Sequence, residues 1–299
     1  MELCLGTVQF GMDYGIRKHK QPTADDAIKI LDFATQHGIS NIDTAAAYGT
    51  AEDIVGEFLS KKTIERGKLF IISKVTPNIL DGIQSKDYKK KINECLLKSL
   101  KRLHTDYLDS YIFHSSRYAF DEKKLEALYE IKKEGRIRHC GISVYYPEEA
   151  KICMESPYVD FIQLPSSLFD QRMLKSGIFE LADQNKSIQI HSRSAFIQGL
   201  LLMNAREVPD YLKSAIPLIN KMEVICKAYN ISKVKLAMLF VKQFSAVSHL
   251  VFGVHNIEQL KEDIDIFSQE TPNDILAEIA TSFDSIPAEI VVPSLWVKE

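Results

Sequence analysis

Short runs of β-branched and aromatic residues alternate with longer amphipathic segments along almost the whole chain. Strands that alternate with helices form βαβ units with parallel pairing. The short runs predict strands at residues 3–6, 39–43, 69–75, 109–113, 139–143, 161–164, 188–192 and 250–252. The longer segments predict helices at residues 24–37, 51–61, 88–103, 122–134, 147–155, 170–185, 233–244 and 257–267. Eight such pairs predict an α/β fold of the closed (β/α)8 type, a TIM barrel, whereas six or fewer would favour an open doubly wound sheet.

The size of the chain agrees with a single barrel. It has 299 residues, and an eightfold barrel needs roughly 250. The sequence contains no low-complexity linker, internal repeat or shift in composition, so we expect one domain over residues 1–299. Residues 203–218 should form an insertion after the seventh strand, and the tail of residues 271–299 should close over the barrel.

Charge and cysteine content bear on partners and compartment. The formal net charge of -3 suggests neither nucleic acid nor an anionic membrane surface as a partner. No segment approaches the roughly 18 consecutive apolar residues of a membrane span. The five cysteines are scattered and form no C-x-x-C pair. This pattern favours reduced thiols in the cytoplasm over a disulfide framework or a zinc site, and we expect no metal.

Four polar residues point to chemistry: Asp43, Tyr48, Lys74 and His114. Three of them, the acid, the lysine and the histidine, lie at or just past the end of a predicted strand. Each alone has a structural explanation, such as a helix cap for Asp43 or a packed loop residue for Tyr48. In a parallel barrel, however, these strand ends meet on one face, where active sites are built. An acid, a phenol, an ammonium and an imidazole gathered there can donate a proton to a carbonyl, which is the chemistry of carbonyl reduction.

Segments along nearly the whole chain resemble the aldo-keto reductase superfamily. LGTVQFG resembles the opening strand and turn of the family, and NIDTAAAYG resembles its Asp–Tyr segment. The passages around the fourth and fifth strands correspond to SLKRLHTDYLDSYIFH and EALYEIKKEGRIRHCGIS. The last three strands correspond to FIQLPSS, SRSAFIQGLL and FGVHNIEQLKEDI. Any one of these matches is weak, but their order and the four catalytic residue types together are specific.

The resemblance implies an NAD(P)H-dependent oxidoreductase that reduces an aldehyde or ketone to the alcohol. Tyr48 would be the general acid. Lys74 would lower the pKa of this phenol, which is ordinarily near 10, and Asp43 would hold the ammonium in place. His114 would hydrogen-bond the substrate carbonyl and stabilise the negative charge that develops there. A dihydronicotinamide cofactor would supply the hydride.

The cofactor would not bind in the manner of a Rossmann fold, because no G-x-G-x-x-G follows a strand. The resemblance implies instead that it lies extended across the strand ends, with Ser143 and Gln163 at the nicotinamide carboxamide. The other cofactor-binding residues that it implies are Gly6 and Thr7 in the opening turn, Arg193, Ser194, Gly199 and Leu201 after the seventh strand, and Gly253, Gln259, Glu262 and Asp263 at the adenosine end.

Some positions depart from the family pattern. Val144 stands where asparagine is common, which would remove one carboxamide contact, and Asp263 replaces another frequent asparagine. Residues 253–259 lack the lysine or arginine that usually binds the 2′-phosphate of NADPH. NADPH is therefore the family default, and NADH stays open.

Arg193 stands where an aromatic side chain usually stacks on the nicotinamide. Its guanidinium plane could stack in the same way. Alternatively, it could face the substrate pocket and bind a carboxylate or phosphate. A third interpretation is an arginine paired with a nearby acid for structural reasons.

Two other function classes stay open. A lysine at a strand end could form a Schiff base, as in barrel aldolases, although Asp43 beside Lys74 would keep the amine charged. A cofactor-binding regulatory subunit is the second. Specificity for the small-molecule carbonyl would depend on the βα loops at residues 10–21, 76–86, 115–121 and 203–218 and on the tail. The substrate and the oligomeric state are not defined by the sequence.

Overall fold

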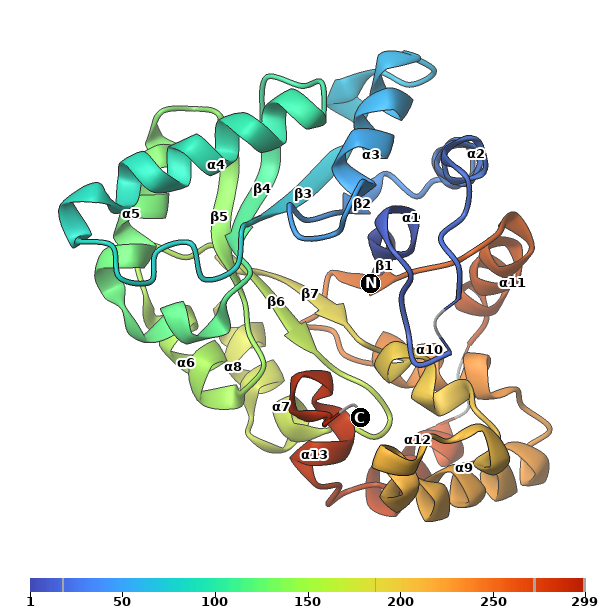
Figure 1. Ribbon diagram of the computed structural model, residues 1–299. Coiled ribbons are helices and arrows are strands. Elements are labelled where there is room, and N and C mark those ends of the chain that lie inside the picture. Colours follow the sequence, from blue (N-terminus) through green and yellow to red (C-terminus); the bar gives the residue numbers. More distant parts are fainter. Residues whose placement is uncertain (18, 186, 271–272, 298–299) are drawn as a thin grey trace.

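The computed structural model describes residues 1–17, 19–185, 187–270 and 273–297, and its centre is a closed barrel of parallel strands surrounded by helices (Figure 1). Each strand pairs in parallel with the next, and β1 closes the barrel by pairing with β8. The predicted (β/α)8 TIM barrel is therefore confirmed. The strands are β1 (Glu2–Gly6), β2 (Asn41–Asp43), β3 (Phe70–Val75), β4 (Leu108–Phe113), β5 (Ile137–Ser143), β6 (Phe161–Pro165), β7 (Gln189–Arg193) and β8 (His249–Phe252).

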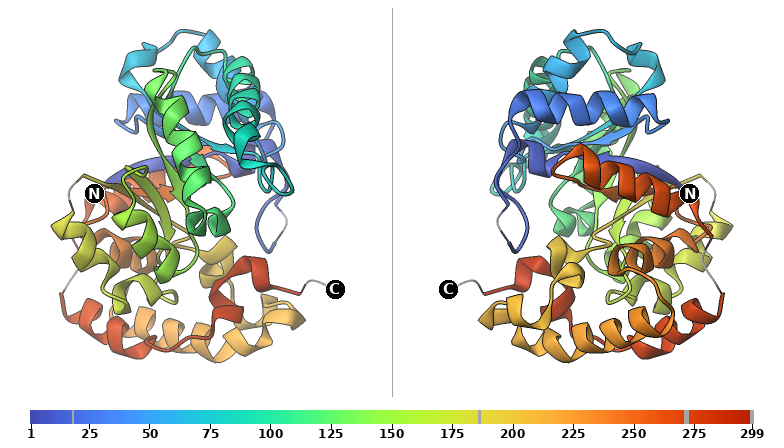
Figure 2. Two further views of the ribbon diagram at one scale, coloured as in Figure 1. Left: turned by 90° about the vertical axis from the view of Figure 1, so that its left-hand side faces the viewer. Right: turned by 90° about the vertical axis from the view of Figure 1, so that its right-hand side faces the viewer.

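The helices cover the outside of the sheet, as the two side views in Figure 2 show. Those that follow the predicted pattern are α2 (Ala24–Gln36), α3 (Ala51–Ser60), α4 (Tyr88–Arg102), α5 (Glu122–Lys133), α6 (Pro147–Glu155), α10 (Lys233–Lys242) and α11 (Ile257–Ser268). Side-chain caps begin several of them: Thr23 accepts from the backbone of Asp26, and Asp121 and Asn256 act in the same way. None of the helices within the described ranges has the length and apolar character that crossing a membrane requires.

The predicted helix at residues 170–185 is wrong in one respect, because the structure breaks it into α7 (Arg172–Lys175) and α8 (Ile178–Gln184). Gly177, between them, has φ = 69°, in the left-handed region that glycine adopts without strain. The side chain of Asp170 binds the guanidinium of Arg172 at 2.7 Å through both carboxylate oxygens. The ion pair lies at the start of α7, and Gly177 precedes α8.

The segment after β7 contains more helix than the sequence pattern suggested. The predicted insertion at residues 203–218 holds two short 3-10 turns and then runs into α9 (Ile216–Ala228), which the pattern did not predict. A further short helix, α1 (Val8–Gly11), follows β1 directly.

The tail forms α12 (Asn273–Ser282) and α13 (Ala288–Val291), while residues 271, 272, 298 and 299 lie outside the described residues. Gln171 donates a side-chain hydrogen bond to the carbonyl of Ile279, and the rings of Phe169 and Phe283 lie 5.1 Å apart. The described tail thus packs against the loop between β6 and α7. The cavity described below has no lining residue from it, so closure over the barrel stays a prediction.

The interior of the barrel is packed in layers, and this places the site. Alternate residues of a strand point to the same side. A cluster of Cys4, Ile72, Ile112 and Phe161 fills the middle of the barrel. Two positions further along the same four chain segments come Gly6, Lys74, His114 and Gln163. Strand periodicity therefore carries polar residues into the next layer, at the carboxyl ends of the strands.

Candidate active site

A cavity of about 470 Å³ lies where the carboxyl ends of the strands meet, and it collects most of the predicted site residues. Asp43, Tyr48 and His114 line it, and Lys74 lies behind them. The predicted cofactor-binding residues that line it are Gly6, Thr7, Ser143, Gln163, Arg193, Ser194, Gly199, Gly253, Gln259, Glu262 and Asp263. The side chain of Leu201 is instead fully buried in the hydrophobic core and does not line the cavity.

Lys74 is a buried, fully bonded ammonium. Its Nζ lies 2.7 Å from each carboxylate oxygen of Asp43 and 3.0 Å from the carbonyl oxygen of Thr44. These three acceptors match the three hydrogens of the ammonium. Gln163 donates its side-chain N–H to Oδ2 of Asp43 at 2.7 Å, which fixes the carboxylate from the other side. The pair predicted from the strand ends is therefore present in the structure.

Tyr48 lies in the loop between β2 and α3, with its ring beside this ion pair. Nζ of Lys74 lies 4.9 Å from the centre of the ring. Burial raises the pKa of the Tyr48 phenol well above its usual range, and the negative charge of Asp43 adds to this, while the charge of Arg193 opposes it. The expected lowering of the Tyr48 pKa by Lys74 is thus not found, because the paired carboxylate of Asp43 offsets the charge of the ammonium.

His114 follows β4 and packs edge-on against Tyr48, with ring centres 5.7 Å apart and an interplanar angle of 85°. Burial lowers the pKa of His114 to about 3, and the positive charges of Lys74 and Arg193 contribute. The imidazole is therefore neutral at physiological pH. Its Nδ1 is buried and has no hydrogen-bond partner among the described residues. A neutral ring carries one N–H, which it can donate to a substrate oxygen.

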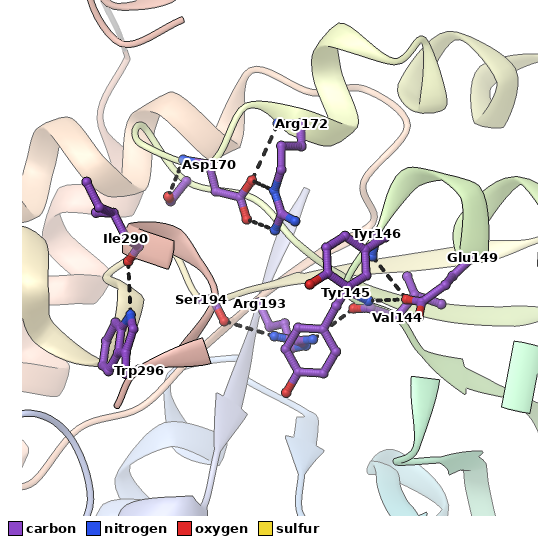
Figure 3. A network of polar contacts seen from close by, with 11 residues as sticks. Val144, Tyr145, Tyr146, Glu149, Asp170, Arg172, Arg193, Ser194, Ile290 and Trp296 are labelled. Carbon is purple, nitrogen blue, oxygen red and sulfur yellow. Dashed lines mark hydrogen bonds and ion pairs between the residues drawn. The ribbon is translucent and has the colours of Figure 1, made fainter. Parts of the chain in front are cut away.

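Arg193 ends β7 and is held on several sides (Figure 3). Its Nε donates to Oγ of Ser143 at 3.2 Å, its Nη2 to the carbonyl oxygen of Val144 at 2.8 Å, and its Nη1 to Oγ of Ser194 at 3.1 Å. The guanidinium carbon lies 4.4 Å from the centre of the Tyr145 ring. No carboxylate bonds to Arg193 among the residues that the structure describes, which contradicts the interpretation of a structural ion pair.

Sequence reasoning did not find Tyr145. It stands in the loop between β5 and α6, and no motif marks it. Only the path of this loop, which Glu149 fixes by accepting from the backbone N–H groups of Tyr145 and Tyr146 at 2.7 and 3.0 Å, brings the ring against Arg193.

The opposite end of the cavity is acidic and lacks lysine among its described lining residues. Asp263 is buried, and burial together with neighbouring Glu262 raises its pKa to about 7. Gln259 accepts from the backbone N–H of His255 at 2.8 Å. Residues 253–259 supply no lysine or arginine to this end of the cavity.

The loop between β1 and α2 adds lining residues that the motifs did not single out, namely Tyr14, Arg17 and His19. Nη2 of Arg17 lies 2.6 Å from a carboxylate oxygen of Glu207, and the rings of His19 and His255 are 4.6 Å apart. This loop was predicted only as a specificity loop. Its side chains reach the same cavity as the cofactor candidates because it folds across the strand ends.

Comparison with known proteins agrees with this geometry. The model of the aldo/keto reductase family matches residues 2–282. The chain belongs to the aldo/keto reductase family. It is 29% identical over 270 residues to the uncharacterized oxidoreductase YqkF of Bacillus subtilis, which covers 85% of this chain and 84% of YqkF. It is 32% identical over 198 residues to the glyoxal reductase of Bacillus subtilis, which covers 64% of this chain and 66% of that protein.

In fold, the chain is similar to the holo form of the aldo-keto reductase AKR11C1 from Bacillus halodurans. The TM-score is 0.77 at 22% sequence identity, over 97% of this chain and 94% of that chain. The resemblance recognised from the motifs is therefore confirmed, and with it the coarser functional conclusion, an oxidoreductase of the aldo/keto reductase family.

Proposed function

We propose that this protein reduces a small aldehyde or ketone to the alcohol with NADPH or NADH, with Tyr48 as the general acid. The observation that carries the proposal is the joint placement of a neutral His114 and the Tyr48 phenol at one end of the cavity, with the bonded Asp43–Lys74 pair behind them. A phenol and a neutral imidazole offer two donors to one carbonyl oxygen.

The residues at this end fit a nicotinamide carboxamide. Ser143 and Gln163 are register partners on β5 and β6. Ser143 Oγ accepts from Arg193, which leaves its own hydrogen to donate, and the amide nitrogen of Gln163 donates to Asp43, which leaves its oxygen to accept. One donor and one acceptor side by side are the complement of a carboxamide. The asparagine that is common at position 144 is thus not needed to define the orientation of the carboxamide, although this chain has Val144 there.

The middle of the cavity also fits an extended dinucleotide. The volume of about 470 Å³ lies within the range of roughly 300–1,000 Å³ of small-molecule and cofactor sites. Oε1 of Gln9 is buried without a hydrogen-bond partner among the described residues, and a Cβ atom at Gly253 would lie 2.3 Å from it. Glycine at position 253 therefore leaves room for the Gln9 side chain, which lines the cavity with an unpaired acceptor.

The protein's own residues account for the protonation side of the reaction. His114 and Tyr48 orient the carbonyl oxygen by hydrogen bonds, and Tyr48 transfers its proton to that oxygen as negative charge develops. Lys74 and Asp43 keep the local charge fixed. A bound dihydronicotinamide supplies the hydride. Burial raises the pKa of Tyr48, so the phenol is protonated at neutral pH and has a proton to donate.

The Schiff-base alternative is disfavoured by the bonds of Lys74. A nucleophilic amine must be uncharged, whereas Asp43 and Thr44 accept the three hydrogens of an ammonium. A regulatory subunit that only binds the cofactor would not require the Tyr48–His114 pair. We therefore retain the reductase, and the relationship to a glyoxal reductase makes short 2-oxoaldehydes the first carbonyls to test.

The decisive experiment is direct binding of NADPH and NADH, followed by turnover with a panel of aldehydes and ketones. Quenching of protein fluorescence measures the first, and loss of reduced-cofactor absorbance measures the second. Binding of neither dinucleotide would refute the proposal. Binding without reduction of any carbonyl would favour the regulatory subunit.

We also expect a modest preference for NADPH, about tenfold or less, because the adenosine end lacks a fixed cation apart from what Arg17 can provide. A charge-assisted bond to the 2′-phosphate is worth about 1.5–3 kcal/mol, or roughly 10 to 150-fold in affinity. Gln259→Arg should raise NADPH affinity and leave NADH affinity nearly unchanged. A preference above about a hundredfold in the unmodified protein would contradict the expectation and would implicate a cation from another loop.

A further inference from the structure

The guanidinium of Arg193 is a rigidly held positive charge beside the proposed nicotinamide site, and no described carboxylate pairs with it. Each of its three nitrogens donates one hydrogen to the protein, to Ser143, Val144 and Ser194. Hydrogen bonds around the edge fix the plane of the group. They also occupy three of the five N–H donors that a guanidinium uses to grip a carboxylate.

The faces of the group are used differently from its edges. Tyr145 covers one face, at 4.4 Å from the guanidinium carbon to the ring centre (Figure 3). Arg193 and Tyr145 both line the cavity, together with Ser143 and Ser194. Because hydrogen bonds occupy the edge of the Arg193 guanidinium and Tyr145 covers one face, its other face is the surface that is left for contact with a ligand. This favours stacking over the fork-like binding of an anionic substrate.

A neighbouring arginine shows that the charge of Arg193 is unusual. Arg172 also lies over a tyrosine ring, with its guanidinium carbon 5.2 Å from the centre of Tyr146. Asp170 neutralises it through two bonds of 2.7 Å, and it does not line the cavity. Arg193 has the same kind of ring contact but no acidic partner among the described residues. Its charge is felt at the reaction centre, because it contributes to the lowered pKa of His114.

We propose that Arg193 and Tyr145 form a cationic platform on which the nicotinamide stacks, and that this platform makes the protein bind the reduced cofactor more tightly than the oxidised one. The inference rests on the proposed function. The oxidised ring carries a positive charge and the reduced ring is neutral, so a fixed cation against its face penalises only the oxidised form. The platform would thereby favour reduction over alcohol oxidation and speed the loss of the oxidised product. Arg193 would be a positioning and specificity-determining residue.

The test is the ratio of the dissociation constants of NAD⁺ and NADH, and of NADP⁺ and NADPH, measured by fluorescence titration. Arg193→Gln removes the charge but keeps a planar amide that can still donate to Ser143 or Val144. We expect the ratio of oxidised to reduced constants to fall about tenfold or more in this variant. Arg17→Gln is the matched control, because it removes one positive charge from another part of the same cavity lining. It should change both constants by the same factor.

Other outcomes overturn the inference. If Arg193→Gln leaves both cofactor constants unchanged and raises KM only for anionic carbonyls, the guanidinium serves the substrate. If Arg17→Gln shifts the ratio as far as Arg193→Gln does, the effect is not local. Absence of dinucleotide binding in the wild type would refute the proposed function and the inference together, whereas normal binding with an unchanged ratio refutes the inference alone. Tyr145→Leu is the second variant to measure if Arg193→Gln does not fold. It removes the supporting ring and leaves the charge, so it should weaken the binding of the reduced cofactor.

Discussion

A lysine that is 1% exposed would be costly if its charge were not balanced on every side. In this barrel Asp43 accepts two of the three hydrogens of Lys74, and Thr44 accepts the third. The arrangement makes the ammonium a fixed charge and not a nucleophile. At the scale of single residues, we therefore assign the proposed chemistry to Tyr48 and His114.

Tyr48→Phe should remove nearly all carbonyl reduction and leave cofactor binding within a few-fold of the wild type. The variant loses the donated proton but keeps the ring against His114. General acid catalysis contributes about 10² to 10⁴-fold in rate. Turnover and cofactor titration of the same preparation measure both quantities. Retention of more than about a tenth of the wild-type rate, with chemistry rate-limiting, would exclude Tyr48 as the acid.

Lys74→Met should lose activity at neutral pH and also destabilise the fold by about 3–5 kcal/mol, because it leaves the buried carboxylate of Asp43 without its cation. Asp43→Asn should lose less activity, since its amide oxygen can still accept one hydrogen of the ammonium. The double variant should recover part of the stability without recovering turnover. Urea unfolding and the pH profile of turnover for the three variants provide the measurements. Greater damage to turnover from Asp43→Asn, by an order of magnitude and without unfolding, would show that the order of dependence is wrong.

At the scale of elements, the site is built from strand ends and the loops that follow them. Gly6, Asp43, Ser143, Gln163 and Arg193 each end or nearly end a strand. The rigid sheet fixes their backbones, and the loops add side chains such as Tyr48 and Tyr145. The end proposed for the adenosine differs, because it depends on α11 and on the loop that precedes α2.

Asp263 on α11 should make stability depend on pH. Its pKa is raised to about 7, above the unfolded value of about 3.9, so its favourable contribution is present at low pH and is lost as pH rises toward 7. Asp263→Asn should therefore raise the free energy of unfolding at pH 8 by about 1–3 kcal/mol and have a smaller effect at pH 5. Urea unfolding at both pH values measures this. Glu258→Gln, at an exposed position on the same helix, is the control. Equal effects of Asp263→Asn at both pH values would contradict the assignment.

At the scale of the whole molecule, the two ends of the barrel have different tasks. The carboxyl end holds the cavity, while the interior toward the other end is packed with aromatic rings and histidines. His191 is fully buried, with its ring centre 4.4 Å from that of His249 and 4.6 Å from that of Phe161. Burial lowers the pKa of His191 well below its usual range, and the nearby His249, Lys74 and His139 add to this.

This buried histidine should weaken the fold in mild acid. Below about pH 6.5 the unfolded chain protonates its histidine while the folded chain does not, so the free energy of unfolding falls as pH drops from about 7.5 to 5.5. His191→Leu should flatten this dependence by up to about 1.4 kcal/mol per pH unit, the limit for one proton. Urea unfolding of both proteins across this range tests it. Identical pH slopes would show that His191 does not contribute.

The sequence by itself determined the barrel, the family and the positions of the residues proposed as catalytic. These follow from local patterns: strand and helix periods mark the elements, and parallel strands must bring Asp43, Lys74 and His114 to one face. The pattern did not predict the break at Gly177, whose left-handed backbone is seen only in the structure.

Only the tertiary structure decided the electrostatics. The pKa of Tyr48 depends on how deeply the ring is buried and on where the ammonium of Lys74 points, and neither is encoded in spacing. The acceptors of Arg193 come from β5 and the loops after β5 and β7, which are separated by about fifty residues of chain. Arg17 reaches the cavity from a loop that no motif marks. Desolvation and charge interactions act across space, so they are settled only when the strands close into the barrel.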